Sequence, residues 1–172
     1  MEMTLLEELA RSNAAVFVPG RQATGYRKLA VLLSGRHSNG SSAEAAALRD
    51  ERLAALIDRS LALLEVPRAS AFWDAWLLHY PRGAMIPGHK DAPDAAGVGH
   101  HRLNALVTPA TRGGVLVIDG DEVALFPGDG VLFRPDLQVH AVSEVVVGER
   151  LVWSVGCWKA AEAHEDADPG VE

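Results

Sequence analysis

The second half of the chain alternates short apolar runs with tight turns, and this pattern limits the folds that are open to it. Seven segments of four to ten residues are rich in Val, Leu, Phe and Trp, and Gly, Pro and Asp separate them. They are residues 71–80, 102–108, 115–118, 122–126, 130–133, 139–147 and 150–158. Short strands at such close spacing predict a sandwich or barrel of the jelly-roll kind.

The first third of the chain has a helical pattern instead. Residues 42–64 carry Leu and Ile at three- and four-residue spacing, with Ser42 as a suitable N-cap and Pro67 beyond the end. Shorter patterns precede this helix. They predict a helix over residues 3–11, a strand over 14–18 and a loop over 34–42.

These patterns predict a mainly β protein with flanking helices, of the α+β class. We expect one domain over residues 1–159, with N-terminal helices in 1–66 and a barrel core in 67–159. The acidic segment 160–172 has almost no large apolar residue, so we expect a disordered tail.

Composition and charge narrow the possible partners and compartments. The formal charge of −7 argues against nucleic acid, which basic surfaces bind. No apolar run approaches the roughly 18–20 residues that a bilayer crossing needs, and no basic cluster precedes an apolar stretch as in a secretory signal. Cys157 is the single cysteine and has no partner for an internal disulfide. We therefore expect a cytoplasmic protein without a membrane or nucleic-acid partner.

The segment PGHKDAP, residues 87–93, carries the sharpest local motif. His89 and Asp91 are two positions apart, so extended backbone projects both side chains from one face. Such a pair is either a hydrogen-bonded surface pair or two thirds of the imidazole–carboxylate triad that binds non-heme Fe(II). His140 begins a distant strand and supplies the third ligand that a barrel site needs from its opposite wall.

Arg150 follows His140 by ten positions, directly after the turn at Gly148. Three protein ligands leave three positions free on an octahedral iron; a 2-oxo acid fills two of them and O2 the last. The far carboxylate of the 2-oxo acid then needs a fixed cation, and the planar guanidinium of arginine donates two parallel hydrogen bonds to a carboxylate. Ser154 shares the face of Arg150 and offers a further donor.

From Tyr80 to Trp158 the chain resembles the iron(II)/2-oxoglutarate-dependent dioxygenase superfamily, most closely in style the prolyl-hydroxylase-like and small-molecule hydroxylase branches. The shared order is YPRGAMIPGHKD, HRLNALV, RGGVLVIDGD, FPGDGVLFRPDLQVHAV and GERLVWSVGCW. The resemblance implies a double-stranded β-helix, a cupin-like jelly-roll barrel. It assigns His89, Asp91 and His140 to iron and Arg150 to 2-oxoglutarate. Tyr80 matches a tyrosine that often lies near the co-substrate, whereas Ser154 departs from the Arg-x-Ser spacing of some members.

The same resemblance implies a reaction. Fe(II), 2-oxoglutarate and O2 together would hydroxylate an unactivated C–H bond, with release of succinate and CO2. Members that chlorinate have a small residue in place of the carboxylate, so Asp91 favours hydroxylation, or a related desaturation or ring closure.

The substrate side is less constrained. Arg102 and Asn104 share a strand face and are candidates to line the pocket. His100 and His101 point to opposite faces, so at most one faces the iron, and His101 is a further substrate candidate. We expect a small molecule or an amino acid as substrate; the sequence leaves the oligomeric state open.

Two other classes stay open at this point. A cupin-type metalloenzyme that does not use 2-oxoglutarate shares the barrel but typically supplies His-x-His followed by Glu. A non-catalytic jelly-roll module that binds a small ligand needs neither a metal nor a buried arginine.

Overall fold

The computed structural model describes residues 2–14, 17–20, 24–33, 50–67, 72–92 and 98–160. They contain the helices α1 (Glu2–Ser12) and α3 (Glu51–Leu63). The strands are β1 (Val18–Pro19), β2 (Arg27–Leu33), β3 (Trp73–Tyr80), β4 (Ile86–His89), β5 (Val98–Thr108), β6 (Arg112–Gly113), β7 (Leu116–Ile118), β8 (Asp121–Val123), β9 (Gly130–Phe133), β10 (His140–Val142), β11 (Val145–Val147) and β12 (Arg150–Ala160). Neither described helix has the length and apolarity that a bilayer crossing requires.

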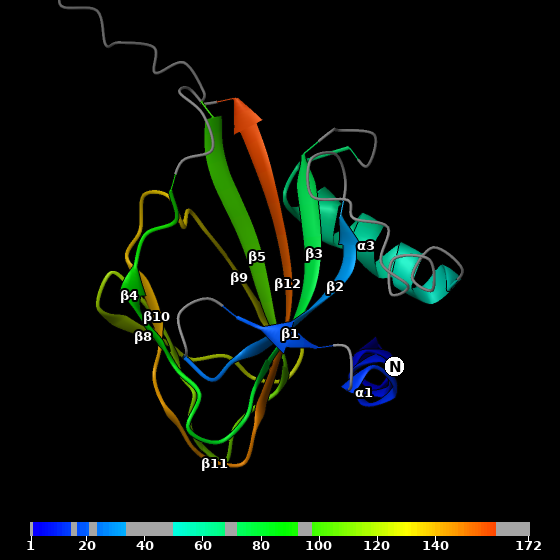
Figure 1. The fold of residues 1–172 in the computed structure, drawn as a ribbon. Coiled ribbons are helices and arrows are strands. Elements are labelled where there is room, and N and C mark those ends of the chain that lie inside the picture. The colour runs from blue at the N-terminus through cyan, green and yellow to red at the C-terminus, as the bar shows by residue number, and fades with distance from the viewer. Residues whose placement is uncertain are drawn as a thin grey trace, which may run out of the picture.

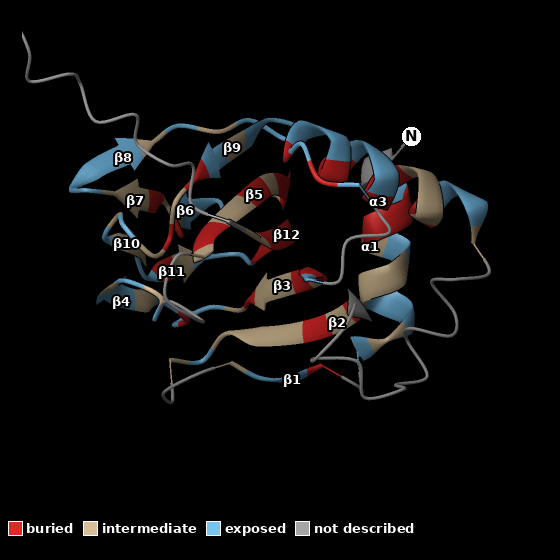
Figure 2. Ribbon diagram, turned by 90° about the horizontal axis from the view of Figure 1, so that it is seen from above, coloured by how far each residue is buried: buried red, intermediate tan, exposed pale blue. Residues whose placement is uncertain are grey.

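The elements form three layers, which Figures 1 and 2 show from two directions. A six-stranded antiparallel sheet, in the order β1-β2-β3-β12-β5-β9, occupies the middle. A smaller sheet in the order β4-β10-β7-β8 faces one side of it, and α1 and α3 cover the other side. The predicted fold class is confirmed: the protein is mainly β, with a jelly-roll barrel and flanking helices.

The central strand β12 shows how the sequence separates the two faces of the large sheet. Leu151, Trp153, Val155 and Cys157 pack into the core that the sheet shares with α1 and α3. The alternate residues, among them Val152 and Ser154, face the inside of the barrel. Burial of each large apolar side chain in this core contributes about 1.5–3 kcal/mol. Because this core stabilises the sheet, the opposite face can hold polar side chains.

Helix α3 is fixed at its start and along its buried face. Asp50 is the N-cap, and its carboxylate accepts hydrogen bonds from the backbone N–H groups of Arg52 and Leu53. Leu53, Leu56, Ile57, Ser60 and Leu61 form the buried face at helical spacing.

The structure corrects the expected extent of this helix. One helix was predicted from Ser42 to Leu64, but the chain is extended at Asp50 and α3 begins only after it, so the prediction was wrong there. Asp50 competes well as an N-cap because its carboxylate satisfies two N–H groups that the first turn leaves without partners. Ser42 and the expected loop 34–42 lie outside the described residues, as do part of the predicted strand 14–18 and the tail beyond Ala160.

The predicted strands also need correction. Residues 139–147 were expected to form one strand, but β10 pairs with β4 and β7 whereas β11 pairs with β6. The chain changes sheets at Ser143 and Glu144, and their apolar neighbours give no signal of this change. The strands β2, β4 and β6 were not among the predicted segments. Pro87 and Gly88 argue against a strand in general, but β4 lies at the edge of its sheet, where proline is tolerated.

A buried hydrogen bond joins α3 to the large sheet, and its loss should lower the stability of the protein. The indole N–H of Trp153 donates to Ser60 Oγ at 3.0 Å, and both residues are buried. Ser60→Ala leaves this donor without a partner, which we expect to lower the free energy of unfolding by about 1–3 kcal/mol in urea titrations. Ser12→Ala removes an exposed serine hydroxyl of α1 and is the control, with a change below about 0.5 kcal/mol. Equal values for the two variants would contradict the role given to Ser60.

Candidate metal centre and cavity

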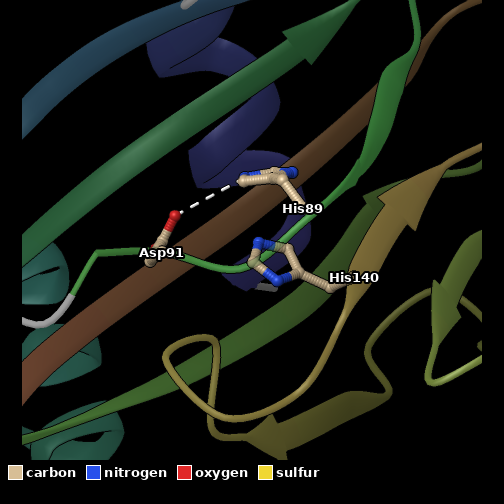
Figure 3. Close-up of side chains that lie close together, drawn as sticks. All are labelled: His89, Asp91 and His140. Carbon is tan, nitrogen blue, oxygen red and sulfur yellow. Dashed lines mark ion pairs between the residues drawn. The ribbon is translucent and has the colours of Figure 1, made fainter.

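The smaller sheet brings together two of the three predicted ligands. β4 and β10 pair antiparallel with His89 opposite His140, and their imidazole rings lie 4.3 Å apart between centroids. Asp91 follows β4 by two residues, and its backbone N–H donates to the carbonyl of Pro135 at 2.8 Å. Figure 3 shows the three side chains converging. One ligand atom from each lies within 4.8 Å of the others, which is a spacing that a single metal ion can bridge.

Backbone carbonyls set the tautomer of both histidines. His89 Nδ1 lies 2.9 Å from the carbonyl of Pro87, and His140 Nδ1 lies 3.2 Å from that of Gln138. A carbonyl oxygen only accepts, so Nδ1 carries the hydrogen in each ring and Nε2 keeps its lone pair. Orientation by an outer partner of this kind is usual for metal-binding imidazoles. Both rings therefore present the lone pair of Nε2 as the atom that could bind a metal ion.

Asp91 supplies the anionic ligand atom. Its Oδ1 lies 3.5 Å from His89 Nε2. Burial raises the pKa of this carboxyl, but the hydrogen bond from His100 and the charge of Arg102 outweigh burial and hold the pKa well below its ordinary value. Burial also lowers the pKa of His140, which favours the neutral imidazole. Two imidazoles and one carboxylate form a donor set that suits Fe(II).

A cavity of about 590 Å³ opens beside the three ligands, between the two sheets. Its volume lies within the roughly 300–1,000 Å³ of small-ligand sites. The aromatic side chains of its wall come from Tyr26, Trp76, Tyr80, Phe133 and Trp158. The predicted residues Asn104, Arg102 and Ser154 line it as well. Asn104 Oδ1 is buried without a hydrogen-bond partner among the described residues, so a ligand that donates a hydrogen bond would satisfy it.

Arg150 and Tyr80 lie opposite each other on β12 and β3. The guanidinium carbon is 5.3 Å from the centre of the tyrosine ring, and the side chain is only 4% exposed. Among the described residues no carboxylate forms an ion pair with Arg150, and burial lowers its pKa. Burial also raises the pKa of Tyr80 to about 12, so its hydroxyl stays protonated as a donor at neutral pH. The two side chains interact with each other, and Tyr80 lines the cavity, whereas Arg150 is not among the described residues that line it.

A second arginine has a different environment. Arg102 donates to Ser154 Oγ at 2.9 Å and pairs with Asp74 at 3.2 Å, so protein groups already compensate its charge. Arg102 lines the cavity, as the sequence predicted, but it is also tied to these protein groups. Asp74 was not singled out in the sequence, because a lone acid in a strand gives no signal of a partner 28 positions away.

The two adjacent histidines point to opposite faces, as strand alternation requires. His100 is the one beside the metal centre, with Nδ1 3.3 Å from Asp91 Oδ2. His101 is half-buried and is not among the described residues that line the cavity, although the sequence had suggested it for the substrate.

Solved structures of several prolyl hydroxylases share this fold. A prolyl-4-hydroxylase from Pseudomonas putida aligns with 94% of this chain and 86% of its own, at 20% identity and a TM-score of 0.58. The viral collagen prolyl hydroxylase of Paramecium Bursaria Chlorella virus-1, solved as a 2OG complex, aligns with 94% of this chain and 92% of its own, at 12% identity and a TM-score of 0.60. A Trichoplax adhaerens prolyl hydroxylase, in complex with a hypoxia inducible factor peptide fragment, covers 91% and 77%, at 19% identity and a TM-score of 0.59.

At these identities the comparison establishes the fold, which confirms the predicted double-stranded β-helix. The resemblance to the prolyl-hydroxylase-like branch is therefore confirmed at the level of structure, with the His-Asp-His cluster in place. No family profile and no curated protein sequence matches the chain.

The geometry predicts which histidines bind metal. His140→Ala removes one Nε2 ligand, and we expect it to weaken Fe(II) binding by more than about 100-fold, because losing a partner that only orients a ligand already costs about 10- to 100-fold. Anaerobic calorimetry measures this. His79→Ala is the control, since His79 pairs with Glu149 on the outer face of the sheet. If both variants bind Fe(II) as the wild type does, the three side chains are not a metal centre.

Proposed function

We propose that the protein is an Fe(II)- and 2-oxoglutarate-dependent oxygenase that hydroxylates a C–H bond of a small molecule or an amino acid. The observation that carries this proposal is the cluster of His89, Asp91 and His140, with both imidazoles prepared to bind through Nε2 at the edge of a cavity. Ferrous iron bound there would couple the reduction of O2 to the oxidative decarboxylation of 2-oxoglutarate, giving succinate and CO2, and to oxygenation of the substrate.

The buried pair Arg150–Tyr80 supports 2-oxoglutarate as the co-substrate. A buried guanidinium without a counter-ion is costly, and a ligand carboxylate that accepts its paired hydrogen bonds offsets that cost. The protonated Tyr80 hydroxyl donates to the same carboxylate. The apolar residues Ile86, Leu116 and Val142 line the cavity near the ligands and would contact the methylene groups of the oxo acid. Arg150, Tyr80 and Ser154 are thus the proposed co-substrate residues.

The cavity supports a small substrate. Asn104 has an unsatisfied buried acceptor, and Trp76 and Trp158 provide flat apolar surfaces beside it. We propose that Asn104 accepts a hydrogen bond from a substrate hydroxyl, amine or amide. The peptide in the Trichoplax adhaerens structure belongs to that enzyme, and a peptide residue would be the second substrate class to test here.

The first experiment separates this function from the two other classes. Fe(II) and 2-oxoglutarate are titrated anaerobically into the protein, and the weak visible charge-transfer band of their chelate is followed. The oxygenase develops the band, and Asp91→Ala abolishes it. A cupin-type metalloenzyme binds Fe(II) without the band, and a ligand-binding module shows neither. Substrate-stimulated succinate formation across amino acids, small metabolites and short peptides then identifies the substrate.

Arg150→Ala provides a test of the co-substrate site. It removes two charge-assisted hydrogen bonds, so we expect the Kd for 2-oxoglutarate to rise by about 100-fold, while that for Fe(II) changes by less than about twofold. Calorimetry with each ligand in turn gives both values. Arg112→Ala changes an exposed arginine of β6 and is the matched control. An equal loss of Fe(II) and 2-oxoglutarate affinity would show that Arg150 serves the fold alone.

A further inference from the structure

The two oxygens of Asp91 have different neighbours. Oδ1 faces the metal side, 3.5 Å from His89 Nε2. Oδ2 lies 3.3 Å from His100 Nδ1, on the side of the large sheet. A carboxylate that follows a short edge strand can rotate, and rotation would exchange the oxygen that a metal meets. His100 contacts only one of the two oxygens, so it distinguishes between them.

His100 is held firmly by its surroundings. The residue is 3% exposed, and its ring stacks on that of Trp158, with centroids 4.6 Å apart and planes 6° from parallel. His100 and Trp158 are paired residues on the neighbouring strands β5 and β12. Because the ring is already held in place, forming a hydrogen bond costs it little further side-chain entropy.

Arg102 sets the tautomer of this ring. Its Nη2 lies 3.2 Å from His100 Nε2. A guanidinium only donates, so Nε2 must accept, and the hydrogen of the neutral ring resides on Nδ1, facing Asp91. Without Arg102 the ring would be free to adopt the other tautomer, in which a bare Nδ1 would repel the carboxylate.

The position of Arg102 is itself fixed across β12. Its guanidinium reaches over Gly156 to Asp74, whose Oδ1 also accepts from the backbone N–H of Gly156 at 3.1 Å. A Cβ atom at Gly156 would lie 2.5 Å from Arg102 Nη2 and 2.8 Å from Asp74 Oδ1. The bridge therefore requires a glycine at this position. The chain of contacts from Asp74 through Arg102 and His100 ends at Asp91.

We propose that His100 is a positioning residue of the metal centre: it fixes the orientation of the Asp91 carboxylate, and Arg102 fixes the tautomer of His100. This inference rests on the proposed metal site, and it assigns to these side chains a role that is neither substrate binding nor core packing. Partners that orient a metal ligand in this way typically change metal affinity by about 10- to 100-fold.

Two variants separate positioning from packing. His100→Phe keeps a flat ring against Trp158 but loses both nitrogens, and His100→Asn keeps an N–H close to the position of Nδ1. We expect His100→Phe to weaken Fe(II) binding by about 10- to 100-fold and His100→Asn to recover most of that loss. The Kd for 2-oxoglutarate, measured at saturating metal, should stay within about twofold of the wild type. His79→Phe, on the outer face, is the control and should bind Fe(II) normally.

The tautomer is tested without any metal. In the apoprotein, ¹⁵N–¹H NMR of the imidazole nitrogens identifies the ring that disappears in His100→Phe or His100→Asn. We expect this ring to carry its hydrogen on Nδ1 in the wild type and to lose this preference in Arg102→Met and Gly156→Ala. Thermal unfolding of each variant reports whether it folds. If a variant does not fold, the position of the hydrogen on the wild-type His100 ring still tests the proposal.

The results test the positioning role of His100 separately from the proposed metal site. A wild type that binds no Fe(II) overturns the metal site and the positioning role together. Normal Fe(II) binding in the wild type and an unchanged Kd in His100→Phe overturn the positioning role alone. Equal losses in His100→Phe and His100→Asn do the same, because the N–H would then be irrelevant. A wild-type His100 with its hydrogen on Nε2 also overturns it.

Discussion

The structure depends on the pairing of β12 with β3 on one side and β5 on the other. Side chains alternate along these strands, so one set packs into the core shared with the helices and the other set faces the inside of the barrel, where several of its members line the cavity. The outward cluster is almost entirely apolar, and its burial stabilises the sheet. The inward face can therefore carry charged and polar groups, among them Asp74, Arg102 and Ser154. Figure 2 shows the buried residues concentrated where the large sheet packs against the helices.

The inward face holds two arginines in different electrostatic states. Arg102 is compensated within the protein by Asp74, whereas Arg150 has no carboxylate partner among the described residues. A buried charge without a charged partner costs several kcal/mol. Arg102 is held in a network of protein groups, whereas the buried environment of Arg150 is the basis for the co-substrate role proposed for it.

The candidate metal centre lies on the smaller sheet and contacts the larger one. His89 and His140 come from the smaller sheet, where neighbouring strands place them side by side. Asp91 belongs to the segment that leaves this sheet, and its second oxygen faces the larger one through His100. The contact of Asp91 with His100 thus links this cluster to the large sheet.

The strand-rich fold and the candidate ligands were predictable from the sequence, because a His-x-Asp pair and a period of two are local signals. Arg150 was a further candidate, through its distance from His140. The start of α3, the break between β10 and β11 and the strand β4 were not predictable, since they depend on the segments that each part of the chain packs against. The contact of His100, not His101, with Asp91 and the pairing of Arg102 with Asp74 are visible only in the folded chain. Those contacts depend on the register of three strands that are distant in the chain, and register is set by packing over the whole sheet.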